Sequence, residues 1–122
     1  MTYYDIYLSA LAYIGESEDG DGTDDYKKRA VHLLPHIVCS LALANRLLGN
    51  ESPEISSLFT LTLESDFPLD LRLAPATSAQ LASLLIIDEL PEMSQTLAKH
   101  AGEETERLLA SVTVVGSTRE VY

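Results

Sequence analysis

The chain has 122 residues, 46% of them hydrophobic, and a formal net charge of -11 from 19 acidic and 8 basic residues. This length and composition predict a single domain over residues 1–122, with enough apolar side chains for a core. The acidic balance argues against nucleic-acid binding through clustered Lys and Arg, and against docking on an anionic membrane surface.

The cysteine content and the N-terminus bear on the cellular compartment. The single cysteine, Cys39, cannot form an internal disulfide. Residues 1–17 lack the basic start and the uninterrupted apolar core of a signal peptide. We therefore expect a cytoplasmic protein in a reducing compartment.

The first predicted element is a short helix over residues 4–14. Its apolar residues recur at helical spacing. Thr2 is a candidate N-cap, and Asp5 would lie favourably in the first turn. Gly15 is expected to end this helix.

An acidic loop is predicted over residues 16–25, which hold six acids and two glycines. Asp19, Asp21 and Thr23 occupy alternating positions, which resembles the ligand spacing of a calcium loop. The turn glycine and the closing glutamate of an EF-hand are missing from their required positions. We therefore interpret the loop as a solvated linker.

A second helix is predicted over residues 24–48, with Thr23 or Asp24 as its N-cap and a Gly-Asn pair after its end. A wide apolar stripe predicts that one side of it is buried. Pro35 lies inside this range. Because proline lacks a backbone donor and crowds the preceding turn, we expect the helix to kink or divide there.

His32, His36 and Cys39 form the one metal-like pattern, since spacings of four and three residues place them on one face of a helix. Imidazole and thiolate suit zinc, but structural zinc usually takes four ligands. The chain has no second cysteine, and His100 is distant in sequence. We interpret the histidines as boundary residues beside a buried free cysteine, with no metal bound.

Residues 50–57 are predicted to form a loop, and residues 58–64 alternate apolar and polar side chains as a strand does. The candidate partner for this strand is 112–115, in an extended tail over 112–122, or an edge strand of another chain. A turn is expected over 66–73.

The densest apolar run, residues 81–90, predicts a central helix from about Leu73 or Pro75 to Glu89, the most buried segment of the fold. Asp88 and Glu89 would lie at its end. Adjacent helical residues point about 100° apart, so we interpret these acids as a solvated helix end rather than a catalytic pair.

The last predicted helix covers residues 92–110 and follows Pro91, a residue favoured in a first helical turn. Gly102 in its middle is expected to permit close packing against a neighbour. The predicted inward-facing residues are Met93, Leu97, Ala101 and Leu108, flanked by Ala98 and Leu109.

Together these elements predict a mainly α fold, a compact bundle of three to four principal helices, with a short β ribbon as an option. The sequence has no glycine-rich phosphate loop, no nucleophile elbow and no Cys/His framework. We therefore expect no enzymatic activity, no cofactor and no metal.

Three segments resemble a group of short phage and prophage proteins from Gram-positive bacteria. These segments are YDIYLSALAYIGE at 4–16, DYKKRAVHLLPHIVCSLALANRLLG at 25–49 and FPLDLRLAPATSAQLASLLIIDELPEMSQTLAKHAGE at 67–103. In size and helical layout these proteins are similar to head–tail connector, or head-completion, proteins. The resemblance implies a non-enzymatic virion assembly protein, a ring subunit that associates with its own copies and with portal or tail components. It transfers no functional residues.

Two other functions remain open from the sequence. One is a host helical adaptor or regulator that binds a protein partner through an apolar groove. The other is a small metal-binding protein that uses His32, His36 and the acidic loop.

Overall fold

The computed structural model describes residues 1–20 and 22–121, with side chains described as far as residue 112. Within these residues the chain is mainly α-helical and contains no strand, only one isolated bridge between Thr2 and Asp66. The predicted mainly α bundle is confirmed. Its elements are α1 (Tyr3–Tyr13), α2 (Thr23–Ser40), α3 (Ala42–Leu47), α4 (Ile55–Leu58), the 3-10 helix η1 (Leu71–Leu73), α5 (Ala74–Leu85) and α6 (Pro91–Val121).

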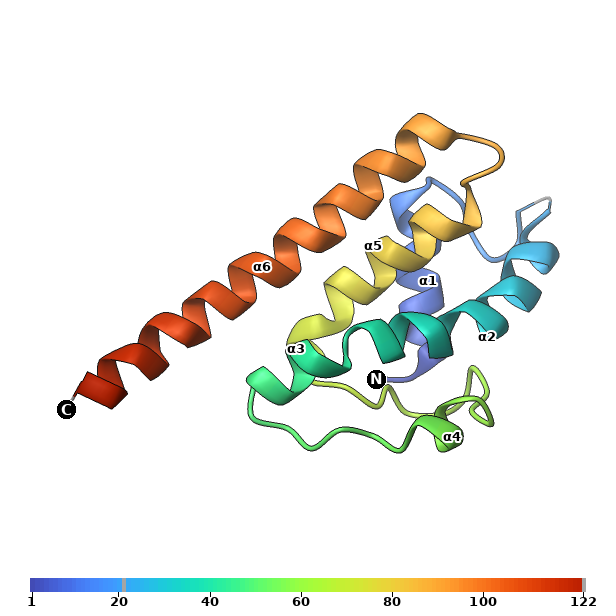
Figure 1. The fold of residues 1–122 in the computed structure, drawn as a ribbon. Coiled ribbons are helices and arrows are strands. Elements are labelled where there is room, and N and C mark those ends of the chain that lie inside the picture. Colours follow the sequence, from blue (N-terminus) through green and yellow to red (C-terminus); the bar gives the residue numbers. More distant parts are fainter. Residues whose placement is uncertain (21, 122) are drawn as a thin grey trace.

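Helix α5 is the centre of the bundle, in contact with α1, α2 and α6 (Figure 1). Most of its side chains are buried, as predicted for this segment. Many are Ala or Ser, which lets the neighbouring helices approach closely. Ser83 and Ser94 join α5 to α6 through two reciprocal bonds: each hydroxyl donates to the other residue's carbonyl oxygen, at 2.7 and 2.8 Å.

Helix α5 ends four residues earlier than predicted, at Leu85. The Arg29 guanidinium on α2 donates to the carbonyl oxygens of Leu84 and Leu85, both at 3.0 Å. The backbone then turns, because the N–H groups of Glu89 and Leu90 both bond to the Ile86 carbonyl. A cation at the negative end of a helix satisfies carbonyls that would otherwise lack partners.

Helix α1 is capped as predicted. The Thr2 hydroxyl accepts from the Asp5 N–H while the Asp5 carboxylate accepts from the Thr2 N–H, which is a capping box. Gly15 follows the helix with a φ of 73°, a conformation that suits glycine. Both ends of α1 are therefore determined by residues local in sequence.

The predicted strand over 58–64 is wrong, because this segment forms the end of α4 and two turns. The Tyr4 N–H of α1 donates to the Leu63 carbonyl of this segment, and the Tyr3 N–H donates to the carbonyl of Ser65, just after it. These are two of the N–H groups that a helix start leaves without an internal partner. An isolated two-stranded ribbon would be marginally stable, whereas this segment supplies hydrogen-bond acceptors to the start of α1.

The predicted division of the helix at Pro35 is wrong, while a kink there stays a prediction. Proline lies inside α2, and the chain divides instead at Leu41, between α2 and α3. Leu34, Ile37 and Val38 on both sides of the proline are buried in the core. Their burial outweighs the one backbone hydrogen bond that proline removes. A capping role for Thr23 is likewise not observed, since the N-cap is Gly22.

Helix α6 begins at Pro91 and continues to Val121, so the extended tail predicted for 112–122 is wrong for the backbone through Val121. Tyr122 lies outside the described residues. The sequence after Ala110 contains no proline, and lengthening an existing helix costs far less than starting one. None of the helices within 1–20 and 22–121 has the length and hydrophobicity that a bilayer crossing requires.

Candidate functional site

The metal-like residues of α2 are spread over different environments. His32 and His36 are exposed, Cys39 is a partly buried free thiol, and the His36 ring packs edge-on against Phe59 at 5.2 Å between centroids. Across the described part of the chain, no three His, Cys, Asp or Glu residues are grouped to hold a metal ion. The structure therefore supplies no geometry for the zinc interpretation.

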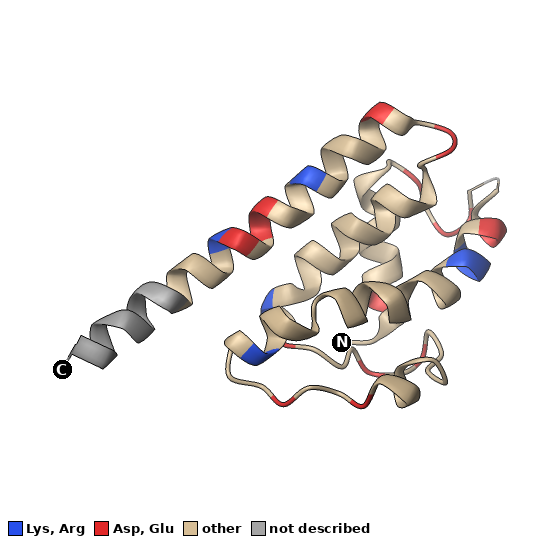
Figure 2. Ribbon diagram, viewed as in Figure 1, with Lys and Arg blue, Asp and Glu red and all other residues tan. Residues whose placement is uncertain are grey.

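The acidic loop joins α1 to α2 (Figure 2), and it is held by hydrogen bonds to Thr23. The Thr23 hydroxyl donates to the carbonyl oxygens of Glu18 and Gly20, at 2.9 and 2.8 Å. The Tyr7 hydroxyl in turn donates to the Thr23 carbonyl at 3.1 Å. Asp19 is exposed, and Asp21 lies outside the described residues. The Thr23 side chain is thus used to close the loop rather than aimed at a cation.

Asp88 and Glu89 lie in the turn between α5 and α6 rather than in a helix. The Glu89 carboxylate accepts a hydrogen bond of 2.8 Å from the Tyr26 hydroxyl. Burial, followed by this bond, raises the pKa of Tyr26 to about 12. Asp88 is exposed. Glu89 therefore ties the turn to α2.

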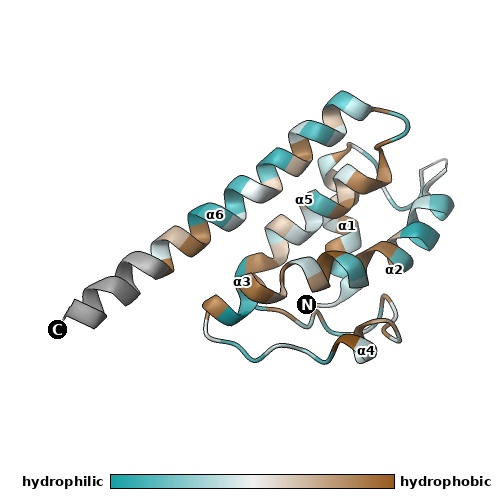
Figure 3. Cartoon of the chain, viewed as in Figure 1, coloured by the Kyte–Doolittle hydropathy of each residue, from teal (hydrophilic) through white to brown (hydrophobic). Residues whose placement is uncertain are grey.

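The most distinctive surface is the end of the bundle where α3, η1 and α6 meet, here called the α3–α6 end. Leu43 and Leu47 on α3 are 65% and 55% exposed, and Leu71 on η1 is 61% exposed. Helix α3 contacts α6. Figure 3 shows strongly apolar segments of α3 and α6 at this same end.

On α6, the α3–α6 end begins after Ala101, where the helix is no longer fully covered by other elements. Of the α6 side chains that the structure describes, none beyond Ala101 is buried. Leu108 and Leu109 are apolar but only partly covered by the core. An apolar surface of this kind on a small protein commonly marks a contact with another protein.

Arg72 links η1 to α3 within the α3–α6 end. Its guanidinium bonds to the Asp70 carboxylate at 3.0 Å and reaches the Leu48 carbonyl after α3 at 3.4 Å. Hydrogen bonds from Arg72 lower the pKa of Asp70 well below its ordinary value. The position of the exposed Leu71 is therefore fixed from both sides.

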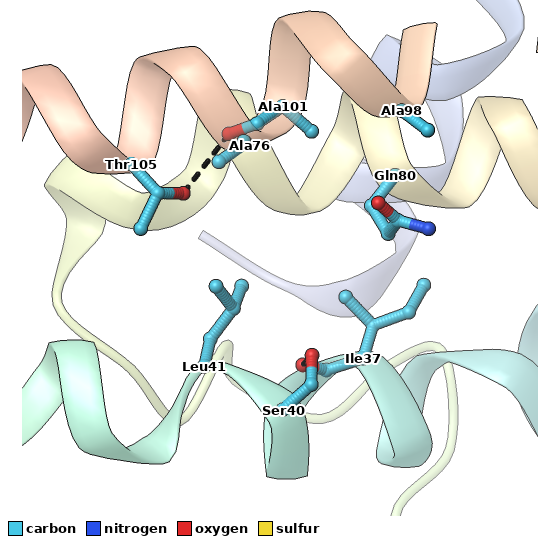
Figure 4. Close-up of a pocket in the computed structure, with 9 residues that line it drawn as sticks. Ile37, Ser40, Leu41, Ala76, Gln80, Ala98, Ala101 and Thr105 are labelled. Carbon is cyan, nitrogen blue, oxygen red and sulfur yellow. Dashed lines mark hydrogen bonds between the residues drawn. The ribbon is translucent and has the colours of Figure 1, made fainter. Parts of the chain in front are cut away.

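An apolar groove opens between α2, α5 and α6, with a volume of about 230 Å³ (Figure 4). Ile37 and Leu41 line one wall and Ala98 and Ala101 the other. No ionisable side chain lines it, so it offers neither an acid nor a base for catalysis. Its shape and chemistry suit an aliphatic or aromatic side chain.

The two hydroxyl groups that line this groove already donate hydrogen bonds to backbone carbonyls. The Ser40 hydroxyl donates to the Ile37 carbonyl at 2.6 Å, and the Thr105 hydroxyl donates to the Ala101 carbonyl at 3.0 Å. Gly102 also lines the groove, and a Cβ atom at this position would meet nothing within 4 Å. The expectation that Gly102 permits close packing is therefore wrong, because it leaves open space instead.

Sequence reasoning did not find the α3–α6 end or the groove. The signal for the first is the stretch 41–48, LALANRLL, which has more apolar residues than one buried face needs. The groove combines residues from three helices, and no local pattern predicts which of them meet. Comparisons with models of known protein families, with curated proteins and with solved structures found no match.

Proposed function

We propose that this chain is a non-enzymatic virion assembly protein, a subunit of a head–tail connector-like ring in a phage or prophage. It acts by binding copies of itself and a portal or tail component, in the host cytoplasm and then in the virion of an active phage. The observation that carries the proposal is the α3–α6 end, with Leu43, Leu47 and Leu71 all more than half exposed.

The kind of assembly comes from the resemblance over residues 4–16, 25–49 and 67–103. The net charge of -11 agrees with this kind of assembly. DNA passes through such a ring, and an acidic inner surface would not bind its phosphates. The groove, which lacks ionisable side chains, favours a binding role over a catalytic one.

The second candidate is a helical adaptor or regulator that binds one protein partner as a monomer. The groove of about 230 Å³ between α2, α5 and α6 favours it, since such a groove accepts apolar side chains from a partner helix. The two functions differ in self-association, which the adaptor does not need.

Solution mass, measured by sedimentation over a concentration series, tests the ring proposal. We expect the native chain to form a closed oligomer and the Leu43→Glu/Leu47→Glu variant to stay monomeric, because charges at an apolar contact are costly to bury. Gln95→Glu/Thr96→Glu adds the same charge at two exposed α6 positions and should assemble normally. A native chain that is monomeric throughout contradicts self-assembly and favours the adaptor.

The virion role has a separate test in the phage or prophage that carries the gene. Disrupting the gene should give heads and tails that fail to join when particles are viewed by electron microscopy. Complete virions from the disrupted phage would contradict the proposal. Portal, capsid or tail genes are expected on either side of this gene.

A further inference from the structure

A second apolar surface lies around α4, away from the α3–α6 end (Figure 1). Ile55 is 66% exposed and Phe59 is 50% exposed, whereas Leu58 between them is buried. Ile55 and Phe59 are four residues apart in helical backbone, so both lie on one side of this turn. The turn therefore uses Leu58 to attach to the core and presents two large apolar side chains outward.

Phe59 is held in position rather than loosely exposed. Its ring packs edge-on against the His36 ring of α2, at 5.2 Å between centroids and 75° between planes. The following residue is fixed as well, since the Thr60 hydroxyl donates to the Ser57 carbonyl at 2.8 Å. An aromatic side chain ordered before binding loses less entropy when a partner covers it.

The sequence that flanks these two side chains is acidic. Between residues 47 and 71 the sequence has five acids and no Lys or Arg. One of the five, Asp70, is paired with Arg72. The other four are exposed and form no ion pair within the part of the chain that the structure describes: Glu51, Glu54, Glu64 and Asp66.

We propose that this surface, named the α4 acidic surface and made of Ile55 and Phe59 with their four unpaired acids, binds a cationic amphipathic segment of another protein. The apolar side of that segment would cover Ile55 and Phe59, and its Lys or Arg residues would face the four carboxylates. Complementary charge of this kind raises the association rate and selects among partners.

Charge also selects against other occupants. A second copy of this chain carries a net charge of -11 and is repelled from an acidic surface. Nucleic acid and anionic lipid are repelled for the same reason. The inference concerns a different surface from the proposed ring contact and does not depend on the ring.

Binding of a synthetic helical peptide of Leu and Lys, with its lysines on one face, tests the proposal by fluorescence anisotropy on the full chain. Ile55→Ser/Phe59→Ser should weaken binding about tenfold, as expected for loss of interface anchors. Neutralising the four acids (Glu51→Gln, Glu54→Gln, Glu64→Gln, Asp66→Asn) should weaken it similarly and reduce its dependence on salt.

A matched control separates this surface from general attraction between opposite charges. Glu16→Gln/Glu18→Gln/Asp19→Asn/Asp24→Asn also removes four exposed negative charges, from the other acidic segment, and should change affinity less than twofold. Equal weakening by both sets of neutralisations would overturn the proposal. Unchanged affinity in Ile55→Ser/Phe59→Ser, with circular dichroism showing a native helix content, would overturn it too.

Discussion

At the scale of single residues, the hydrogen bonding of the buried polar groups is the feature that the sequence reveals least. Ser83 and Ser94 look like ordinary small residues in the sequence, yet both are buried and each hydroxyl donates to the other's carbonyl. Tyr3 has the opposite arrangement: its hydroxyl is buried with no hydrogen-bond partner among the described residues. Removing a bonded hydroxyl and removing an unbonded one should therefore change the free energy of unfolding by different amounts.

Ser83→Ala is expected to lower the free energy of unfolding by about 1–3 kcal/mol, because it leaves a buried Ser94 hydroxyl and carbonyl with fewer partners. Urea denaturation measures this change. Adding Ser94→Ala should cost less than the sum of the two single changes, since the residues share the same bonds. Ser9→Ala, at an exposed α1 position, is the control and should lie within about 0.5 kcal/mol of the native chain.

The buried tyrosines predict how stability depends on pH. Burial raises the pKa of Tyr3 to about 12, and burial and the Glu89 bond raise the pKa of Tyr26 to about 12, against an ordinary value of 10.0 for tyrosine. A raised folded-state pKa means that the folded state holds the proton more tightly. This contribution is complete below pH 10 and is lost as the pH rises towards 12.

We therefore expect the urea midpoint to fall between pH 10 and pH 12, and to fall less steeply in Tyr26→Phe. At pH 7 the same variant should be less stable than the native chain because it lacks the bond to Glu89. Tyr3→Phe removes a hydroxyl with no partner and should not lose stability there. A midpoint that stays constant through pH 12 would contradict the burial of both phenols.

At the scale of elements, α5 carries the core, and the buried side chain at its C-terminal end tests this. Leu85→Ala should lower the free energy of unfolding by about 2–5 kcal/mol, because the side chain is fully buried and a cavity would remain. Ile87→Ala, two residues away and 48% exposed, is the matched control. A loss within experimental error for Leu85→Ala would mean that α5 is peripheral.

The helix ends also show which features a local sequence pattern can predict. The ends of α1 were predictable because Thr2, Asp5 and Gly15 act on their own neighbours. The end of α5 was not, since it is capped by Arg29, which lies 55 and 56 residues away in sequence. No local pattern records such a partner.

Two mistaken elements share a physical cause, which is that tertiary contacts override local preference. The alternation over 58–64 is real in the sequence, but Leu63 and Ser65 serve the start of α1 instead of a sheet. Pro35 is tolerated because the helix on both sides of it is anchored in the core. The groove was unpredictable for the same reason, because packing alone brings Leu41 and Ala101 to opposite walls of one groove.

At the scale of the whole molecule, the C-terminal part of α6 bears on assembly. Truncation after Ser111 is expected to lower the mass of the proposed oligomer, because it removes Val112 and the apolar Val114 and Val115 that follow in sequence. Sedimentation of both chains at equal concentration measures the difference. An identical mass for the truncated chain would confine the self-contact to residues before 112.

The central place of α5 has a consequence for how the chain emerges from the ribosome. Helices α1 and α2 are synthesised well before the helix against which both pack. Until α5 follows, the apolar faces of both helices, with Ile6, Leu11 and Leu34, lack the surface that buries them. Nascent chains with such faces are prone to aggregate. The growing polypeptide should therefore depend most on chaperones during the interval between synthesis of α2 and synthesis of α5.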